Sequence, residues 1–241
     1  YSGSTSITAG TIAIAADSGL GSAPGSATAG QLTLAGGTLE STASLSLDAN
    51  RGLALGSGGG TLFVDSGTSL SYDGIIAGAN NLTKSGAGTL ILGGANTNSG
   101  STAINAGTLS LTQVAALGDT TATSVASGAV LDFNFNNASL GNSNAITLQG
   151  AGIGGNGALS FSGTNVTLSN ALILGSDSSI GGSGSGTLNG VVSGAFNVTK
   201  VGSGSLTLSG SNTYSGSTTI NTGTLSLGAA SGLGNTTATS V

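Results

Sequence analysis

Few side chains in this sequence could carry out chemistry, and their types limit what that chemistry could be. The 241 residues include no His, Cys, Met or Trp, so acid–base or nucleophilic roles fall to three basic residues, three tyrosines and eight carboxylates. The carboxylates are scattered and form neither a D-x-D pair nor a Gly-Gly-x-Gly-x-Asp calcium repeat. They are Asp17, Glu40, Asp48, Asp65, Asp73, Asp119, Asp132 and Asp177. We therefore predict no metal-binding and no cofactor-binding residue.

One group of charges could form a polysaccharide-cleaving site. Asp48 and Arg51 are neighbours in the sequence, and Asp65 follows about one repeat length later. Hydrolysis of a glycosidic bond needs two carboxylates on either side of that bond. Solvated charges at turns explain the same three residues without any reaction. We expect the latter, and predict no catalytic residue and no enzyme activity.

The remaining polar candidates recur with a repeat. Lys84 and Lys200 are equivalent positions, and we expect solvated charges at an edge or turn, within reach of a carbonyl. Asn96 and Asn212 are also equivalent, and their amides should satisfy the backbone of turns. Five asparagines stand in N-x-S/T sequons, which Asn- and Thr-rich composition produces by chance; glycosylation is the alternative. These are Asn81, Asn137, Asn165, Asn197 and Asn235.

Composition excludes several partners. Three basic residues cannot form the positive face that nucleic acid requires, and the net charge is −5. No apolar window of about 18 residues exists, so we expect no membrane-spanning helix. Gly- and Ser-rich chains are often disordered, but a mean hydropathy of +0.34 with 5% charged residues indicates a folded chain. Because the sequence begins and ends within repeats, we expect a fragment of a longer protein.

The positions of these residues depend on an internal repeat. Residues 82–111, LTKSGAGTLILGGANTNSGSTAINAGTLSL, return as residues 198–227, and a partial copy occupies residues 1–14. Between the copies a smaller unit recurs about every 19 residues, namely two apolar residues separated by a small one. Leu90 and Leu92 form one such pair. Residues i and i+2 of a strand face the same side, so each pair can point into a core.

Stacked coils explain both periods. Glycine-free segments are too short for helices, whereas Thr, Val and Ile favour strands and Gly, Asn and Ser favour turns. We predict one continuous all-β segment over residues 1–241, a right-handed parallel β-helix of about 12 coils of roughly 19–20 residues. At about 4.8 Å per coil it would be roughly 60 Å long.

Two places disturb the pattern of apolar pairs. Val130 has Asp132 where its apolar partner is expected, while Leu131 and Phe133 have the other parity. Gly190 stands where a second apolar residue is expected after Leu188. We expect a local bulge or register shift at each place; a ligand-binding notch is the alternative.

The long repeat resembles a known family. KSGAGTLILGGANTNSGSTAINAGTLSL and its copy follow the pattern K-x-G-x-G-x-L-x-L-x-G-x-N-x-Y-x-G-x-T of the passenger-associated transport repeat of bacterial autotransporters. Asn98 departs from the Tyr of that pattern, whereas Tyr214 matches it. The resemblance implies export to the cell surface, a β-helical fold, and a rigid stalk presenting adhesive or catalytic modules. It also implies a C-terminal membrane barrel, which this sequence lacks.

We therefore expect an extracellular structural β-helix, acting as a stalk or as a filament that associates end to end through the open edges of its coils. An adhesin that binds cells or glycans is the alternative. A flat face of Thr and Ser could also bind ice or crystalline polysaccharide. The outward residues, however, alternate irregularly, and no single T-x-T face is visible. They are Ala13, Thr33, Ala54, Ser71, Ile91 and Ser110.

Overall fold

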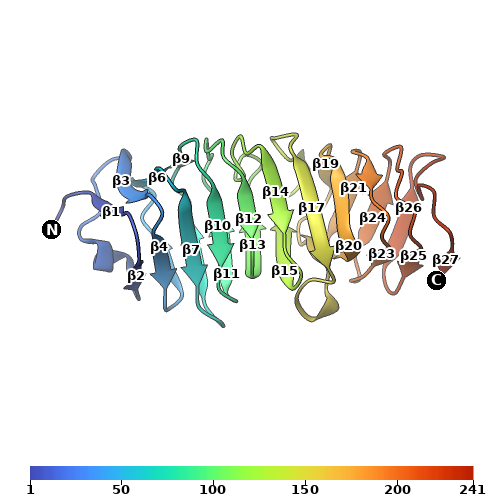
Figure 1. Ribbon diagram of the computed structural model, residues 1–241, viewed down its shortest axis with the longest axis horizontal. Coiled ribbons are helices and arrows are strands. Elements are labelled where there is room, and N and C mark those ends of the chain that lie inside the picture. The colour runs from blue at the N-terminus through green and yellow to red at the C-terminus, as the bar shows by residue number, and fades with distance from the viewer. Residues whose placement is uncertain (241) are drawn as a thin grey trace. The chain divides into compact units, whose positions relative to one another are not determined.

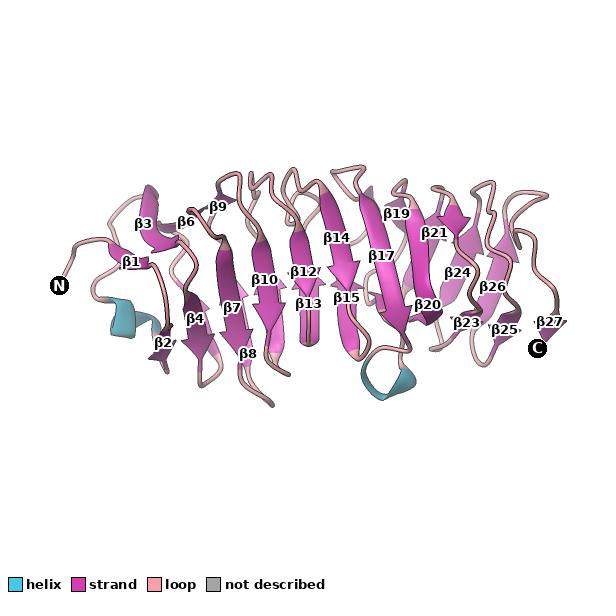
Figure 2. Ribbon diagram, in the orientation of Figure 1, coloured by secondary structure: helices cyan, strands magenta, loops and turns pink. Residues whose placement is uncertain are grey.

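Short parallel strands dominate the protein. The computed structural model describes residues 1–240, in which the strands are joined by tight turns and only two short 3-10 turns occur (Figure 2). Contacts within the chain cluster into two units, Tyr1–Thr121 and Ala122–Val241. Each unit is described by itself. In the described residues, no helix is long and apolar enough to cross a membrane.

The first unit contains three ladders of parallel strands, so each full coil has three sides. One ladder is β1 (Thr5–Ile7), β3 (Thr28–Leu34), β6 (Arg51–Leu55) and β9 (Ile76–Ala77). The second is β2 (Thr11–Ile14), β4 (Thr38–Ser41), β7 (Gly60–Val64), β10 (Leu82–Ser85) and β12 (Thr102–Ile104). The third is β5 (Leu45–Leu47), β8 (Ser69–Tyr72), β11 (Thr89–Leu92) and β13 (Gly107–Leu111). The turn η1 (Asp17–Leu20) follows β2.

The second unit repeats this arrangement. Its first ladder is β14 (Ala122–Val125), β17 (Ala145–Gly150), the first half of β20 (Leu172–Gly181) and β22 (Val192–Ser193). The second is β15 (Ala129–Phe133), β18 (Leu159–Phe161), the second half of β20, β23 (Val198–Lys200), β25 (Thr218–Ile220) and β27 (Thr239–Ser240). The third, a separate sheet, is β16 (Ala138–Ser139), β19 (Val166–Leu168), β21 (Ser185–Leu188), β24 (Ser205–Leu208) and β26 (Thr224–Leu227). The turn η2 (Ile153–Gly155) follows β17.

The apolar pairs form the core, as predicted. Leu70, Leu90 and Leu109 are register partners on consecutive strands, and all three are fully buried. In Figure 1, strands β4, β7 and β10 lie side by side, in agreement with their pairing. Backbone N–H and C=O groups of these strands pair with the coils before and after them, so hydrogen bonds join the coils while the aliphatic columns fill the interior.

The prediction of a parallel β-helix is confirmed, but the number of coils is about ten rather than about 12. Coils differ in length because turns and loops absorb extra residues. Hydrogen-bonded equivalents lie 20 residues apart at Asn96 and 28 apart at Asn136. A register shift between Thr28 and Leu32 adds residues to β3. The right-handed sense remains a prediction from the crossover preference.

The two expected irregularities have different explanations. Leu131 and Phe133 are the inward pair of β15, and they align with Leu159 and Phe161 of β18 without a bulge. The Phe133 and Phe161 rings stack with centroids 5.6 Å apart. The expectation of a bulge within this strand pairing was therefore wrong. In β15 the odd-numbered residues Leu131 and Phe133 point inward instead of Val130 and Asp132. Asp132 is nevertheless buried, and the Ser162 hydroxyl donates to its carboxylate at 2.8 Å.

Gly190 is not the missing core residue. Leu188 aligns with Leu168 and Leu208, so the apolar position that is vacant in β21 is Gly186. A Cβ on Gly186 would lie 2.6 Å from the Phe161 ring, which fills this space. Gly190 lies in the following turn, where a Cβ would meet the Asn170 carbonyl oxygen. The local irregularity is therefore a compensation of side-chain volume, in which Gly186 leaves room for the large Phe161 ring.

Candidate functional site

Asp48, Arg51 and Asp65, the alternative cleavage site, are not joined by an ion pair among the described residues. Arg51 is almost fully buried at 2% exposure and pairs with Asp17, with Nε–Oδ1 2.8 Å and Nη2–Oδ2 2.9 Å. Its guanidinium also donates to the carbonyls of Leu20 and Gly21. This is the single ion pair among the described residues, and it does not include Asp65. The expectation that Arg51 is a solvated turn charge was wrong.

Asp17 and Asp48 complete the surroundings of Arg51. Burial would raise the pKa of Asp17, but hydrogen bonds from the Arg51 side chain and the Asp48 backbone lower it overall. The Asp48 carboxylate accepts from the backbone N–H of Asn50 at 2.8 Å. All three guanidinium nitrogens of Arg51 thus donate to protein oxygen atoms, and the group is buried away from a substrate. The arrangement fastens η1 to β6 and suits a structural role.

The equivalent lysines lie in the core rather than in solvent. Lys84 is 0% exposed, and its register partners on the neighbouring strands are Leu62 and Ile104. Its Nζ donates to three backbone carbonyls, Ser85 at 2.8 Å, Gly86 at 2.7 Å and Ala106 at 3.1 Å. An ammonium group has three donors, and all three are used. The expected contact with a carbonyl is confirmed, whereas the expected solvation is wrong.

The second lysine repeats this geometry. Lys200 is 2% exposed and donates to Val201, Gly202 and Thr222 at 2.7, 2.8 and 3.2 Å. Burial lowers the pKa of both lysines, that of Lys84 to about 8. Gly107 and Gly223 border the two ammonium groups; both have positive φ, and a Cβ there would lie 2.8 Å or less from Nζ. A side chain at either glycine would displace the lysine, so the lysine and the glycine form one structural unit.

Asn96 and Asn212 satisfy backbone groups, as predicted, but they do so between coils. The Asn96 Oδ1 accepts from the Ile76 N–H at 2.8 Å, and its Nδ2 donates to the Ala116 carbonyl. The Asn212 amide bridges Val192 and Gly232 in the same way. Both asparagines are nearly buried. Each therefore links the coil before it to the coil after it.

The sequon asparagines belong to surface ladders. The Asn197 Nδ2 donates to Asp177 Oδ2 at 2.9 Å, and its Oδ1 accepts from the Ser217 N–H at 2.7 Å. The Asn165 Nδ2 donates to Asn137 Oδ1 at 2.8 Å. At Asn165 and Asn197, the amide nitrogen that glycosylation would modify is already hydrogen-bonded. This geometry favours a structural role for these two side chains.

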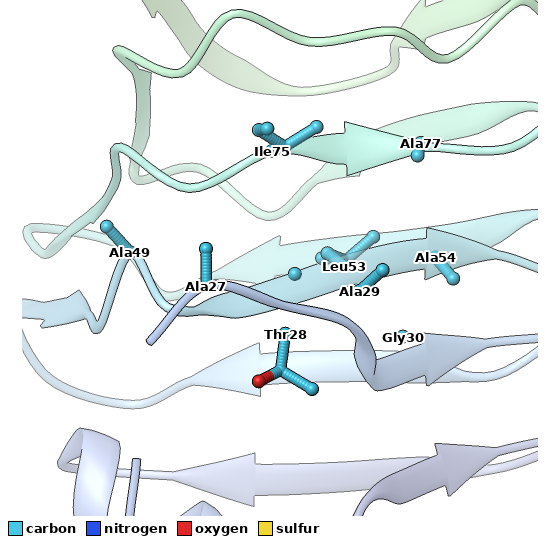
Figure 3. A pocket seen from close by; sticks show the side chains of 10 residues that line it. Ala27, Thr28, Ala29, Gly30, Ala49, Leu53, Ala54, Ile75 and Ala77 are labelled. Atoms are coloured by element: carbon cyan, nitrogen blue, oxygen red, sulfur yellow. The ribbon is translucent and has the colours of Figure 1, made fainter. Parts of the chain in front are cut away.

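An apolar groove lies on the first unit beside the register shift of β3. Its volume is about 240 Å³, and Figure 3 shows the short side chains of Ala27, Ala29 and Ala49 near Leu53, with Ile75 beyond them. Ile75 is 48% exposed. Thr28 supplies the lining's only polar side chain. The groove can take up a small apolar group, but it presents no acid, base or nucleophile beyond that hydroxyl.

The outward residues of the separate sheet in the second unit form regular rows. One row contains a hydroxyl on each of five consecutive strands; its members are Ser139, Thr167, Thr187, Thr207 and Ser226. A second row, two residues earlier on three strands, consists of Ser185, Ser205 and Thr224. All are exposed or half-buried. We call these eight residues the hydroxyl array.

Reasoning from the sequence missed this array because it compared residues from different sides of the coils. Thr33 and Ala54 lie on β3 and β6, whereas Ser71 and Ile91 lie on β8 and β11 of another sheet. Their irregularity therefore did not test any single face. A usable signal was present in the triplets SGT, SLT and TLS at residues 185–187, 205–207 and 224–226.

No group of three or more His, Cys, Asp or Glu side chains that could hold a metal ion occurs in residues 1–240. Four carboxylates bond to neighbouring protein groups, namely Asp17, Asp48, Asp132 and Asp177. The polar geometry therefore serves contact between coils, and the hydroxyl array is a regular surface feature without charge.

Comparison with known proteins agrees with this geometry. The model of the passenger-associated transport repeat family matches residues 1–14, 82–111 and 198–227. Over 184 residues the chain is 39% identical to the adhesin BmaC autotransporter of Brucella suis biovar 1 (strain 1330). That alignment includes 75% of this chain and 5% of the relative, so the chain corresponds to a small part of it. No solved structure matches the chain.

Proposed function

We propose that this chain, which carries passenger-associated transport repeats and is a β-helical segment of an autotransporter passenger, acts as a rigid spacer. Passengers of this kind are extracellular and lie at the cell surface. The observation that supports the proposal best is the state of Lys84 and Lys200. These are the charged side chains of the long repeat, and both ammonium groups are saturated by backbone carbonyls.

Stiffness follows from how the coils are joined. Aliphatic columns lie inside and parallel hydrogen bonds run between coils, while Asn96 and Asn212 each bridge two further coils. Bending a coil away from its neighbour would break several of these bonds at once and expose apolar surface. Each added coil extends the stack by about 4.8 Å. Each such repeat therefore lengthens the passenger by a fixed distance.

This proposal can be tested by replacing the segment within an autotransporter passenger that is displayed on cells. Replacing it by an unrelated parallel β-helix with the same number of coils should preserve the height of an epitope placed beyond it. A Gly/Ser linker of equal residue number should not, because such a linker is a flexible coil. Equal heights with both replacements would contradict the spacer role.

We propose further that the segment has no catalytic activity. Supporting this, Arg51, Lys84 and Lys200 are all engaged with protein oxygen atoms. Incubation with a panel of polysaccharides tests the point. Cleavage that is lost in Asp48→Asn or Asp65→Asn would contradict it and restore the hydrolase alternative.

Adhesion is the second candidate, because the relative from Brucella suis is named an adhesin. Binding of the purified segment to cells, with saturation, would favour adhesion over spacing alone. Adhesion that resides elsewhere in the full passenger would leave the isolated segment without binding. The two roles are compatible when the spacer also carries a binding face.

We also propose that residues 1–241 form one continuous β-helix and that isolated segments associate end to end. Within the described residues β1 pairs only with β3 and β26 only with β24, and Leu227 is 50% exposed. Unpaired strand edges accept further strands. Sedimentation should show association that rises with concentration and weakens in Leu227→Lys. A monomer at all concentrations would contradict association, and two separate unfolding transitions would contradict continuity.

A further inference from the structure

A row of four register-aligned threonines, from Thr11 to Thr83, also lies on β2, β4, β7 and β10 of the first unit. What distinguishes the hydroxyl array is its lack of charge. Neighbouring members of a row lie about 4.8 Å apart, because they are on neighbouring strands, and the two rows lie about 6.6 Å apart along each strand. No charged residue occurs in the five strands that carry it. In contrast, the face formed by β4 and β7 in the first unit places Glu40 beside Phe63.

The hydroxyls of the central row are available to a ligand. Thr167, Thr187 and Thr207 are half-buried outward residues, and their hydroxyls have no protein partner within the described part of the chain. In the second row, Ser185 accepts from the Asn165 N–H at 2.7 Å. Each hydroxyl offers one donor and two acceptor sites. Thr also has a stiff χ1, so the row is held in position before any ligand binds.

We propose that the hydroxyl array binds a neutral, extended β-linked polysaccharide lying along the stack of coils. Absence of charge disfavours polyanions, which require Lys or Arg. Hydroxyls that both donate and accept complement sugar hydroxyls, and successive coils repeat the same contacts along a straight polymer. A glucan that coils on itself cannot follow straight rows.

The array also determines how binding depends on polymer length. None of its five strands carries an exposed aromatic side chain on which a sugar ring could stack. One coil therefore binds one sugar weakly, and affinity arises from many equivalent contacts. Glucose and cellobiose should not compete, whereas the insoluble polymer should retain the protein. The inference is independent of the spacer role, since a spacer needs no ligand.

Adsorption of the purified chain to microcrystalline cellulose tests the proposal, with amylose resin as the coiled glucan. We expect saturable binding to cellulose and none to amylose. The triple variant T167V/T187V/T207V keeps the β-branched shape and removes three hydroxyls. It should lower the binding constant about tenfold or more, since several hydrogen bonds are lost together.

Matched variants separate loss of the array from loss of fold. T61V/T83V/T89V removes three half-buried outward hydroxyls from the first unit and should leave binding unchanged. Circular dichroism should show the same fold for both triple variants, because Val favours strands. Thr187→Lys, a single charge in the middle of the array, provides a second test and should also lower the binding constant.

Three results would overturn the proposal. The first is failure of the wild-type chain to bind cellulose. The second is equal binding by the wild type and T167V/T187V/T207V. The third is adsorption to ice crystals with none to cellulose, which would assign the array to ordered water instead of a glycan. A failure of the spacer proposal would appear in the epitope-height experiment and would leave these results unaffected.

Discussion

Tyr214 and Thr218 share a buried hydrogen bond, with their hydroxyl oxygens 2.8 Å apart. The equivalent residues of the preceding long repeat are Asn98 and Thr102, and there neither Asn98 Nδ2 nor Thr102 Oγ1 has a partner. Both residues are about 1% exposed. The repeat thus contains one satisfied and one unsatisfied version of the same contact, 116 residues apart.

Replacing Asn98 with Tyr should stabilise the protein. The site has the right neighbour, because Gly118 lies against Asn98 as Gly234 lies against Tyr214. A tyrosine hydroxyl there would pair with Thr102, as Tyr214 pairs with Thr218. We expect the free energy of unfolding to rise by about 1–2 kcal/mol, measured by urea denaturation.

Tyr214→Phe is the matched control. It removes one hydroxyl and leaves Thr218 unpaired, so stability should fall by about 1 kcal/mol. A destabilising N98Y together with a neutral Y214F would show that the hydroxyl pair contributes nothing to the repeat.

The buried lysines predict an unusual pH dependence. Burial lowers the pKa of Lys84 from 10.5 to about 8 in the folded state, while the unfolded chain keeps the ordinary value. Between these values the unfolded state binds more protons, so stability rises with pH. From pH 7 to pH 9 we expect a gain of about 1 kcal/mol from Lys84, with Lys200 adding in the same direction.

The double variant K84M/K200M supplies the control for this prediction. Its unfolding free energy should be lower at pH 7, because six hydrogen bonds to carbonyls are lost. It should also be nearly constant between pH 7 and pH 9. A wild-type stability that falls over this range would contradict the assigned burial.

Asn212→Ala should destabilise the second unit. The variant removes the acceptor for the Val192 N–H and the donor to the Gly232 carbonyl, and both groups are buried by neighbouring coils. We expect a loss of about 2 kcal/mol or more. Asn189→Ala, at an exposed turn, should stay within about 0.5 kcal/mol of the wild type. Equal losses in the two variants would contradict a bridging role for Asn212.

Asp17→Asn should loosen the start of the first unit. Arg51 is buried and would lose its carboxylate partner, so we expect a loss of about 2–3 kcal/mol. Hydrogen exchange should quicken in η1 and β6 and stay unchanged in the second unit. Because burial is part of the interaction, the effect should persist in about 0.5 M salt. Uniform quickening across the chain would argue against a local role.

The sequence predicted much of the core because period-two alternation is present in most strands. Leu90 and Leu92 illustrate this, since their inward positions follow from spacing alone. Lys84 could not be placed in the same way. A charge beside turn glycines usually lies in solvent, and its burial depends on three carbonyls, one of them in the next coil.

Contacts between residues far apart in the sequence could not be predicted either. Asp17 lies 34 positions before Arg51, and nothing in their local sequence marks them as partners. The hydroxyl array can be recognised only when it is known which residues share a sheet. Coil lengths that vary from 19 to 28 residues conceal this from the sequence. Periodicity shows that a face exists, whereas register shows which residues occupy it.

The most direct test of the account is removal of whole coils from the purified chain. Deletion of residues 166–205 joins Asn165 to Leu206, the register equivalent of Val166 two coils later. If coils are interchangeable units of length, small-angle X-ray scattering should show a folded particle whose longest dimension is shorter by about 10 Å. A disordered particle, or one of unchanged length, would contradict the account.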